Sequence, residues 1–127
     1  MRNLIIIGLG GFIGAILRYL VSGQVQKWSG SIDFPYGTLA VNLLGCLLIG
    51  ALTRLDEIRD ILTPEMRFLI FIGLLGAFTT YSTFSNETVT LINDRRFALA
   101  FLYMGTHLVL GLGAVLAGRL TTYLVWR

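Results

Sequence analysis

Four long apolar stretches dominate the chain, and short polar segments separate them. The stretches cover residues 4–21, 36–52, 68–92 and 97–125, with Glu87 inside the third and Arg119 inside the fourth. About 20 helical residues cross the hydrocarbon core of a bilayer, so each stretch is long enough to form a transmembrane helix. The pattern predicts an all-α membrane protein with four transmembrane helices, in a single domain over residues 1–127.

Composition indicates the same lipid environment. The chain has 127 residues, of which 55% are hydrophobic and 13% charged, and its mean hydropathy is +0.77. A soluble domain carries roughly twice that share of charged residues. The first stretch, which follows Arg2, could also be a signal peptide, but no small-residue cleavage site follows it and Arg18 lies inside it. We therefore expect it to remain as the first helix.

The basic residues divide almost evenly between the two ends of such a bundle. If odd and even loops lie on opposite sides, one side carries Arg2, Arg54, Arg59, Arg67 and Arg127, with Arg119 nearby, and the other carries Lys27, Arg95 and Arg96, with Arg18 nearby. By the positive-inside rule this small bias permits insertion in both orientations, although the first helix could also fix one orientation. The net charge of +3 suits a bilayer with anionic headgroups as partner, and no basic patch indicates nucleic acid.

The third stretch contains an unusual segment at residues 76–85, Gly-Ala-Phe-Thr-Thr-Tyr-Ser-Thr-Phe-Ser. Polar groups at membrane depth must face protein, an ion or water, so this segment is the expected functional part. Thr79, Thr83 and Glu87 recur every four residues and would form one polar stripe along a helix. Glu87 could be a solvated helix end or could line a vestibule.

Four further polar side chains lie inside the apolar stretches. Thr38 and Asn42 are four residues apart, and the Asn42 amide can donate two hydrogen bonds, either as a structural interhelical bond or in a pathway. His107, the only histidine, could bond a neighbouring helix or line an ion path, but the chain cannot supply the ligands of a zinc site. Arg18 is expected about one turn from the end of the first helix, where it could extend to the interface.

Small residues recur where helices could approach closely in a membrane. The pairs are Gly10 with Gly14, Gly45 with Gly50, Gly73 with Gly76, and Ala114 with Gly118. Four helices can hardly enclose a pore by themselves. The chain is therefore expected either to be a simple interaction module or to pair with another copy.

Three motifs in order along the chain resemble the Fluc, or CrcB, family of fluoride channels. They are Gly-Gly-Phe-Ile-Gly-Ala-Ile-Leu-Arg-Tyr at 10–19, Gly-Thr-Leu-Ala-Val-Asn-Leu-Leu-Gly at 37–45, and the segment at 76–85. The resemblance extends over the whole chain in length, number of segments and motif order. It implies a multi-pass protein of the bacterial plasma (inner) membrane, with a broken third helix, that forms a dual-topology homodimer of antiparallel subunits with two fluoride pathways.

The resemblance also implies a sodium ion, Na+, at the dimer centre, which is structural and not transported. Its family ligands are backbone carbonyls at the break in the third helix, and they map onto Gly76 and Thr79. A broken helix exposes carbonyls at the negative end of its first half, and glycine eases the break.

The fluoride pathway of the family maps onto Asn42, Tyr81, Phe84, Ser82 and Thr83. Tyr81 stands where the family usually has phenylalanine, which keeps the ring edge and adds a hydroxyl. Arg18 matches a family arginine near the vestibule, and Thr38, Glu87 and His107 are expected to support the pathway or its vestibule. Because fluoride is tightly hydrated, ring edges, hydroxyls and amides must replace its water.

The implied mechanism is passive fluoride export, which limits the toxicity of the ion to the cell. The sequence contains no nucleophile paired with a base, no phosphate-binding loop and no paired carboxylates, so we do not expect an enzyme. A proton-coupled exporter of organic cations is one alternative, but it needs a carboxylate in its binding site, and Glu87 lies beyond the polar segment. A non-conducting assembly subunit is the other, and it would leave the threonine-rich segment unexplained.

Overall fold

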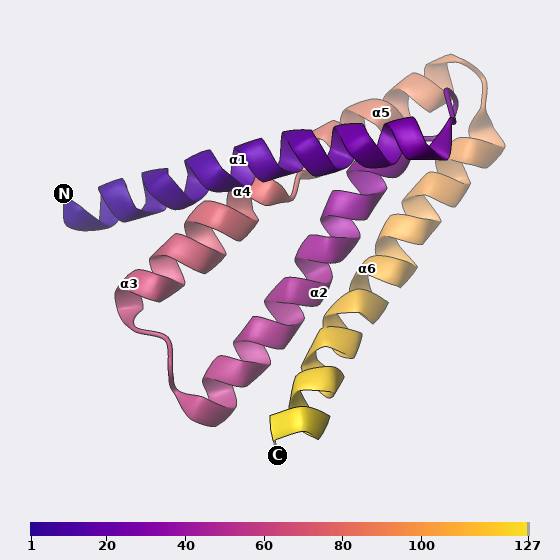
Figure 1. Ribbon diagram of the computed structural model, residues 1–127. Helices are drawn as coiled ribbons and strands as arrows, with labels where there is room; N and C mark the ends of the chain where they lie inside the picture. Colours follow the sequence, from indigo (N-terminus) through magenta and orange to yellow (C-terminus); the bar gives the residue numbers. More distant parts are fainter. Residues whose placement is uncertain (127) are drawn as a thin grey trace.

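The computed structural model describes residues 1–126, a bundle of helices joined by short connections (Figure 1). Three helices are continuous: α1 (Arg2–Ser29), α2 (Tyr36–Arg59) and α6 (Phe97–Trp126). Between α2 and α6, the third span is composed of α3 (Pro64–Arg67), the π-helical η1 (Phe68–Leu75), α4 (Gly76–Phe78) and α5 (Tyr81–Asn93). With this composite counted once, 4 helices are long and apolar enough to cross a membrane, and residues 1–126 contain no β-strand. The predicted all-helical, four-span fold is confirmed.

The first helix is longer than its apolar stretch. It continues to Ser29 and ends at Gly30, whose φ of 62° is left-handed and favours glycine. The polar Gln26 in this extra part bonds the following loop, donating to the carbonyls of Ser31 (2.6 Å) and Phe34 (3.2 Å). Arg18 is therefore about three turns from the end of α1, and the expectation of one turn is wrong.

The helices pack as two associated pairs. α2 lies along α6 in the most extensive contact, while α1 lies along η1 and α4. In Figure 1, α1 and the α2–α6 pair converge at the end of the molecule that carries the α1–α2 and α5–α6 connections. Glycines allow the close approach: a Cβ atom on Gly118 would lie 2.2 Å from the Leu47 carbonyl oxygen, and one on Gly14 would lie 2.2 Å from that of Leu74. Such close backbone contact is typical of membrane helix packing.

Ion pairs group the connections into two ends of the bundle. At one end the pairs join Arg2 with Glu65 (2.6 Å), Arg67 with Asp56 (2.9 Å) and Arg119 with Glu57 (2.8 Å). At the other end, Arg96 pairs with Asp33. The first and third connections between spans therefore lie at the end opposite to the second connection. The division of the basic residues between two sides requires this arrangement.

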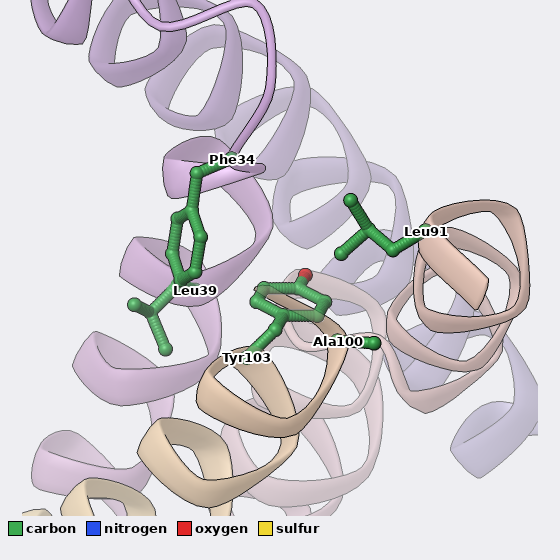
Figure 2. Close-up of a cluster of buried hydrophobic side chains, with 5 residues drawn as sticks. All are labelled: Phe34, Leu39, Leu91, Ala100 and Tyr103. Carbon is green, nitrogen blue, oxygen red and sulfur yellow. The ribbon is translucent and has the colours of Figure 1, made fainter. Parts of the chain in front are cut away.

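A cluster of buried side chains fixes α5, α6 and the start of α2 relative to one another. It consists of Phe34, Leu39, Leu91, Ala100 and Tyr103. Figure 2 shows the Tyr103 ring between Phe34 and Leu91. Tyr103 is 0% exposed, and the centroids of the Phe34 and Tyr103 rings lie 5.3 Å apart in an edge-to-face arrangement.

Candidate functional site

The third span bends at its middle, where two threonines leave the helical conformation. Thr79 (φ −89°, ψ 157°) and Thr80 (φ −151°, ψ 113°) are extended, while Gly76 keeps helical dihedrals (φ −62°, ψ −35°). The Thr80 hydroxyl accepts a hydrogen bond from the Thr83 amide (3.2 Å) and so caps the start of α5. The extended backbone needs other partners, because lipid offers none.

Asn42 on α2 supplies the partners for the backbone of Thr80. Its Oδ1 accepts from the Thr80 amide at 2.8 Å, and its Nδ2 donates to the Thr80 carbonyl at 3.1 Å. One side chain thus pairs with both polar groups of an extended residue, much as a neighbouring strand would. The structural interhelical bond that the sequence left open for Asn42 is present.

His107 on α6 lies on the other side of the Asn42 amide. Its Nε2 is 3.2 Å from Asn42 Nδ2, and its Nδ1 is 3.0 Å from the Tyr103 carbonyl oxygen. Because a carbonyl only accepts, Nδ1 carries the hydrogen and Nε2 accepts from Asn42. The imidazole in this arrangement is therefore neutral, and its ring centroid lies 4.3 Å from that of Phe84.

A pocket of about 500 Å³ opens between α2, the third span and α6. Its lining includes six of the residues that the sequence singled out: Asn42, Gly76, Thr79, Tyr81, Phe84 and His107. The rest of the wall is largely apolar, and none of its described lining residues is acidic. The bend therefore brings amide, ring and backbone groups together in one apolar pocket.

A second pocket of about 450 Å³ contains the other predicted supporting residues, Thr38 and Glu87. The Glu87 carboxylate accepts hydrogen bonds from the Thr38 hydroxyl (2.8 Å) and the Tyr103 hydroxyl (2.6 Å). Arg96 also lines this pocket, and its hydrogen bond to Asp33 raises the pKa of the guanidinium, which remains charged at any physiological pH. Tyr103 links the two pockets, since its hydroxyl bonds Glu87 and its carbonyl bonds His107.

Three predicted residues lie outside both pockets. Ser82 and Thr83 are exposed on the surface of the single chain, and neither lines a described pocket. Arg18 is half-buried on α1, one turn before the pocket-lining Ser22, and forms no ion pair within residues 1–126. Tyr81 lines the first pocket yet is 79% exposed.

Sequence reasoning missed Tyr103 and Thr80. Tyr103 lies in an apolar stretch and is typical of a core aromatic there, although its spacing of four from His107 places both on one face of α6. Thr80 acts through its backbone, which no side-chain pattern reveals.

Comparisons with known proteins identify one matching family model and several similar proteins. The family model described as "CrcB-like protein, Camphor Resistance (CrcB)" matches residues 5–119. A protein of Oceanobacillus iheyensis named "Fluoride-specific ion channel FluC" is 44% identical over 124 residues, which cover 97% of this chain and 94% of the relative. Proteins of that name from Shewanella woodyi and Shewanella frigidimarina are 43% and 47% identical over 119 residues, covering 94% of each chain.

These relatives are named as ion channels, and ion channels are not enzymes. The four apolar helices make this chain a multi-pass membrane protein. With the family model matched over most of its length, the chain belongs to the CrcB-like family.

Proposed function

We propose that this protein is a fluoride-specific ion channel of the bacterial inner membrane, through which cytoplasmic fluoride leaves passively down its electrochemical gradient. Export by this route lowers the toxicity of the ion to the cell. The relatives' shared name supports the conducted ion. The observation in this chain that carries the proposal is the pocket in which Asn42 lies with Tyr81 and Phe84 at the bend of the third span.

The chemistry of this pocket suits a small anion. Fluoride that enters an apolar pocket must exchange its water for other hydrogen-bearing groups. The Tyr81 and Phe84 rings, with centroids 5.6 Å apart, offer their positive edges. The Asn42 amide hydrogen that is directed at His107 Nε2 would be donated to the ion in place of His107. No acidic side chain among the described lining residues repels the ion.

Two copies of the chain are proposed to form the channel as an antiparallel homodimer. Ser82, Thr83 and Tyr81 are exposed near the midpoint of the third span. Hydroxyl groups at that depth need protein or water beside them. A second copy packed against the start of α5 would cover them and would place Ser82 and Thr83 along a pathway. The near balance of basic residues at the two ends allows the two copies opposite orientations.

A structural sodium ion at the centre of this dimer would bind backbone carbonyl oxygens at the bend. In a continuous helix the Thr80 amide would donate to the Gly76 carbonyl, but here it donates to Asn42. The Thr83 amide likewise donates to the Thr80 hydroxyl and not to the Thr79 carbonyl. The carbonyl oxygens of Gly76 and Thr79 thereby lose their helical donors, and hard cations bind such oxygens. We expect both copies to supply them to Na+, whose charge would favour nearby anions.

Fluoride efflux from liposomes separates this proposal from the two alternatives. Efflux of fluoride without any requirement for a proton gradient supports the channel. Proton-coupled uptake of an organic cation would support the exporter, whose essential carboxylate would have to be Glu87, which lies outside the first pocket. No flux of either kind would support an assembly subunit.

The substitution Phe84→Ile tests the pathway itself. It keeps an apolar side chain but removes the ring edge, so we expect it to abolish fluoride efflux while the dimer stays folded. A fluoride electrode measures efflux, and size-exclusion chromatography in detergent checks the dimer. Phe101→Ile is the matched control, because Phe101 is 71% exposed and lines no described pocket. Undiminished efflux from Phe84→Ile would count against this pathway.

A further inference from the structure

Asn42, Thr80 and His107 form a hydrogen-bonded group in which every hydrogen bond can form only while His107 is neutral. The Asn42 amide bonds both polar groups of the Thr80 backbone, and its second Nδ2 hydrogen is directed at His107 Nε2 at 3.2 Å. If the amide were flipped, its oxygen would face the Thr80 carbonyl and its nitrogen would face the Thr80 amide. Thr80 therefore fixes the orientation of Asn42.

The orientation of His107 is fixed in the same way. Its Nδ1 hydrogen is held by the Tyr103 carbonyl at 3.0 Å, so Nε2 is the atom that a further proton would occupy. With a hydrogen on Nε2, two donors would face each other with no acceptor between them. Neither side chain can turn away without breaking its other hydrogen bonds.

We propose that His107 couples fluoride binding to pH, because the protonated imidazole and the Asn42 amide together form a two-donor site for an anion in the first pocket. This inference rests on the proposed channel function. Fluoride accepts hydrogen bonds and donates none, so it would relieve the opposition of Nε2 and Nδ2. Both atoms belong to residues that line the pocket.

Other titratable groups lie near His107 on its own helix, on α5 and on α2. Tyr103 is on its own helix, Tyr81 and Glu87 are on α5, and Cys46 is on α2. Only Glu87 is acidic, and its carboxylate already accepts the hydroxyl hydrogens of Thr38 and Tyr103. The part of η1 and α4 that lines the pocket contributes no titratable side chain.

Protonation would slow conduction. The new site would hold fluoride more tightly, and a channel site must release its ion to conduct. By linkage, bound fluoride would favour the protonated imidazole by the same factor.

Efflux at two pH values tests the coupling. With equal pH on both sides of the liposome, we expect wild-type efflux to fall about tenfold from about pH 7.5 to about pH 5.5. His107→Gln keeps a polar amide that does not titrate, so its efflux should be the same at both pH values.

Thr106→Val is the matched control. The Thr106 hydroxyl bonds the same Tyr103 carbonyl (3.0 Å), and Thr106 lines no described pocket. The Thr106→Val channel should keep the wild-type pH response. Protein-free liposomes measure how much hydrogen fluoride leaks through the bilayer itself.

Nitrogen NMR of His107, the only histidine in the chain, provides a second readout that needs no variant. A tenfold preference of fluoride for the protonated form would raise the pH of half-protonation by about one unit in sodium fluoride relative to sodium chloride. An equal midpoint in the two salts, or a His107→Gln profile that follows wild type, would overturn the coupling and leave the channel intact. Absence of wild-type efflux at the higher pH would instead contradict the channel.

Discussion

At the scale of single residues, Asn42 has a structural task and a proposed functional one. It completes the hydrogen bonding of an extended backbone that lipid cannot solvate. The same side chain lines the pocket that we propose for fluoride. Both tasks depend on the carboxamide of Asn42, so a substitution that removes its hydrogen-bond donors should affect both stability and fluoride efflux.

Asn42→Asp keeps the size of the side chain and exchanges its donor for a carboxylate oxygen. The Thr80 carbonyl would then face an acceptor, which costs about 1–3 kcal/mol of stability for the unsatisfied group, and the negative charge would repel fluoride. We expect efflux to be suppressed and the unfolding temperature in detergent to fall. Asn86→Asp adds the same charge at an exposed position of α5 and should do neither. An unchanged efflux rate in Asn42→Asp would show that Asn42 only joins helices.

The sequence identifies side chains more readily than their partners. Asn42 and His107 are conspicuous because amides and imidazoles are rare at membrane depth, and the structure places them 3.2 Å apart. Thr80 could not be identified as their partner, because it bonds Asn42 through its backbone. Tyr103 could not be distinguished from a core aromatic, because only the fold shows its hydroxyl beside Glu87.

At the scale of helices, hydropathy predicted which segments cross the membrane, but it did not predict their local geometry. The sequence located the irregular part of the third span at Gly76 to Thr79, whereas the extended residues are Thr79 and Thr80. β-Branched threonine favours extended backbone, and the Thr80 hydroxyl stabilises the start of α5. The π-helical geometry of η1, which precedes the extended residues, could not be predicted, because its sequence is an unbroken apolar stretch.

The contact between α2 and α6 should depend on Gly118. A methyl group there would meet the Leu47 carbonyl oxygen at 2.2 Å and the Ala51 nitrogen at 2.8 Å. Gly118→Ala must therefore push the helices apart, and we expect a loss of about 1–3 kcal/mol in unfolding free energy, measured by denaturant unfolding in detergent micelles. Gly113→Ala on the same helix meets nothing within 4 Å, so it should be neutral or gain up to about 1 kcal/mol from helix propensity. Equal effects of the two substitutions would contradict the packing argument.

At the scale of the whole molecule, the single chain leaves polar groups exposed that a bilayer does not solvate. Ser82, Thr83 and Tyr81 are exposed on one chain near the centre of a span. The apolar pattern predicts the number of spans, but it carries no direct signal for a surface that a second copy covers. The balance of basic residues at the two ends is the whole-chain feature that bears on this question, since it sets the orientation of insertion.

Labelling of cysteines placed at the two ends of the bundle tests the proposed antiparallel pair. Ile32 is 99% exposed between α1 and α2, and Ile61 is 53% exposed between α2 and α3. In a Cys46→Ala background, which removes the only native cysteine, we expect Ile32→Cys and Ile61→Cys each to be labelled to about one half by a membrane-impermeant maleimide on intact cells. Permeabilised cells should give full labelling of both. Full labelling at one position and none at the other would mean a single orientation, and an antiparallel homodimer could not then form.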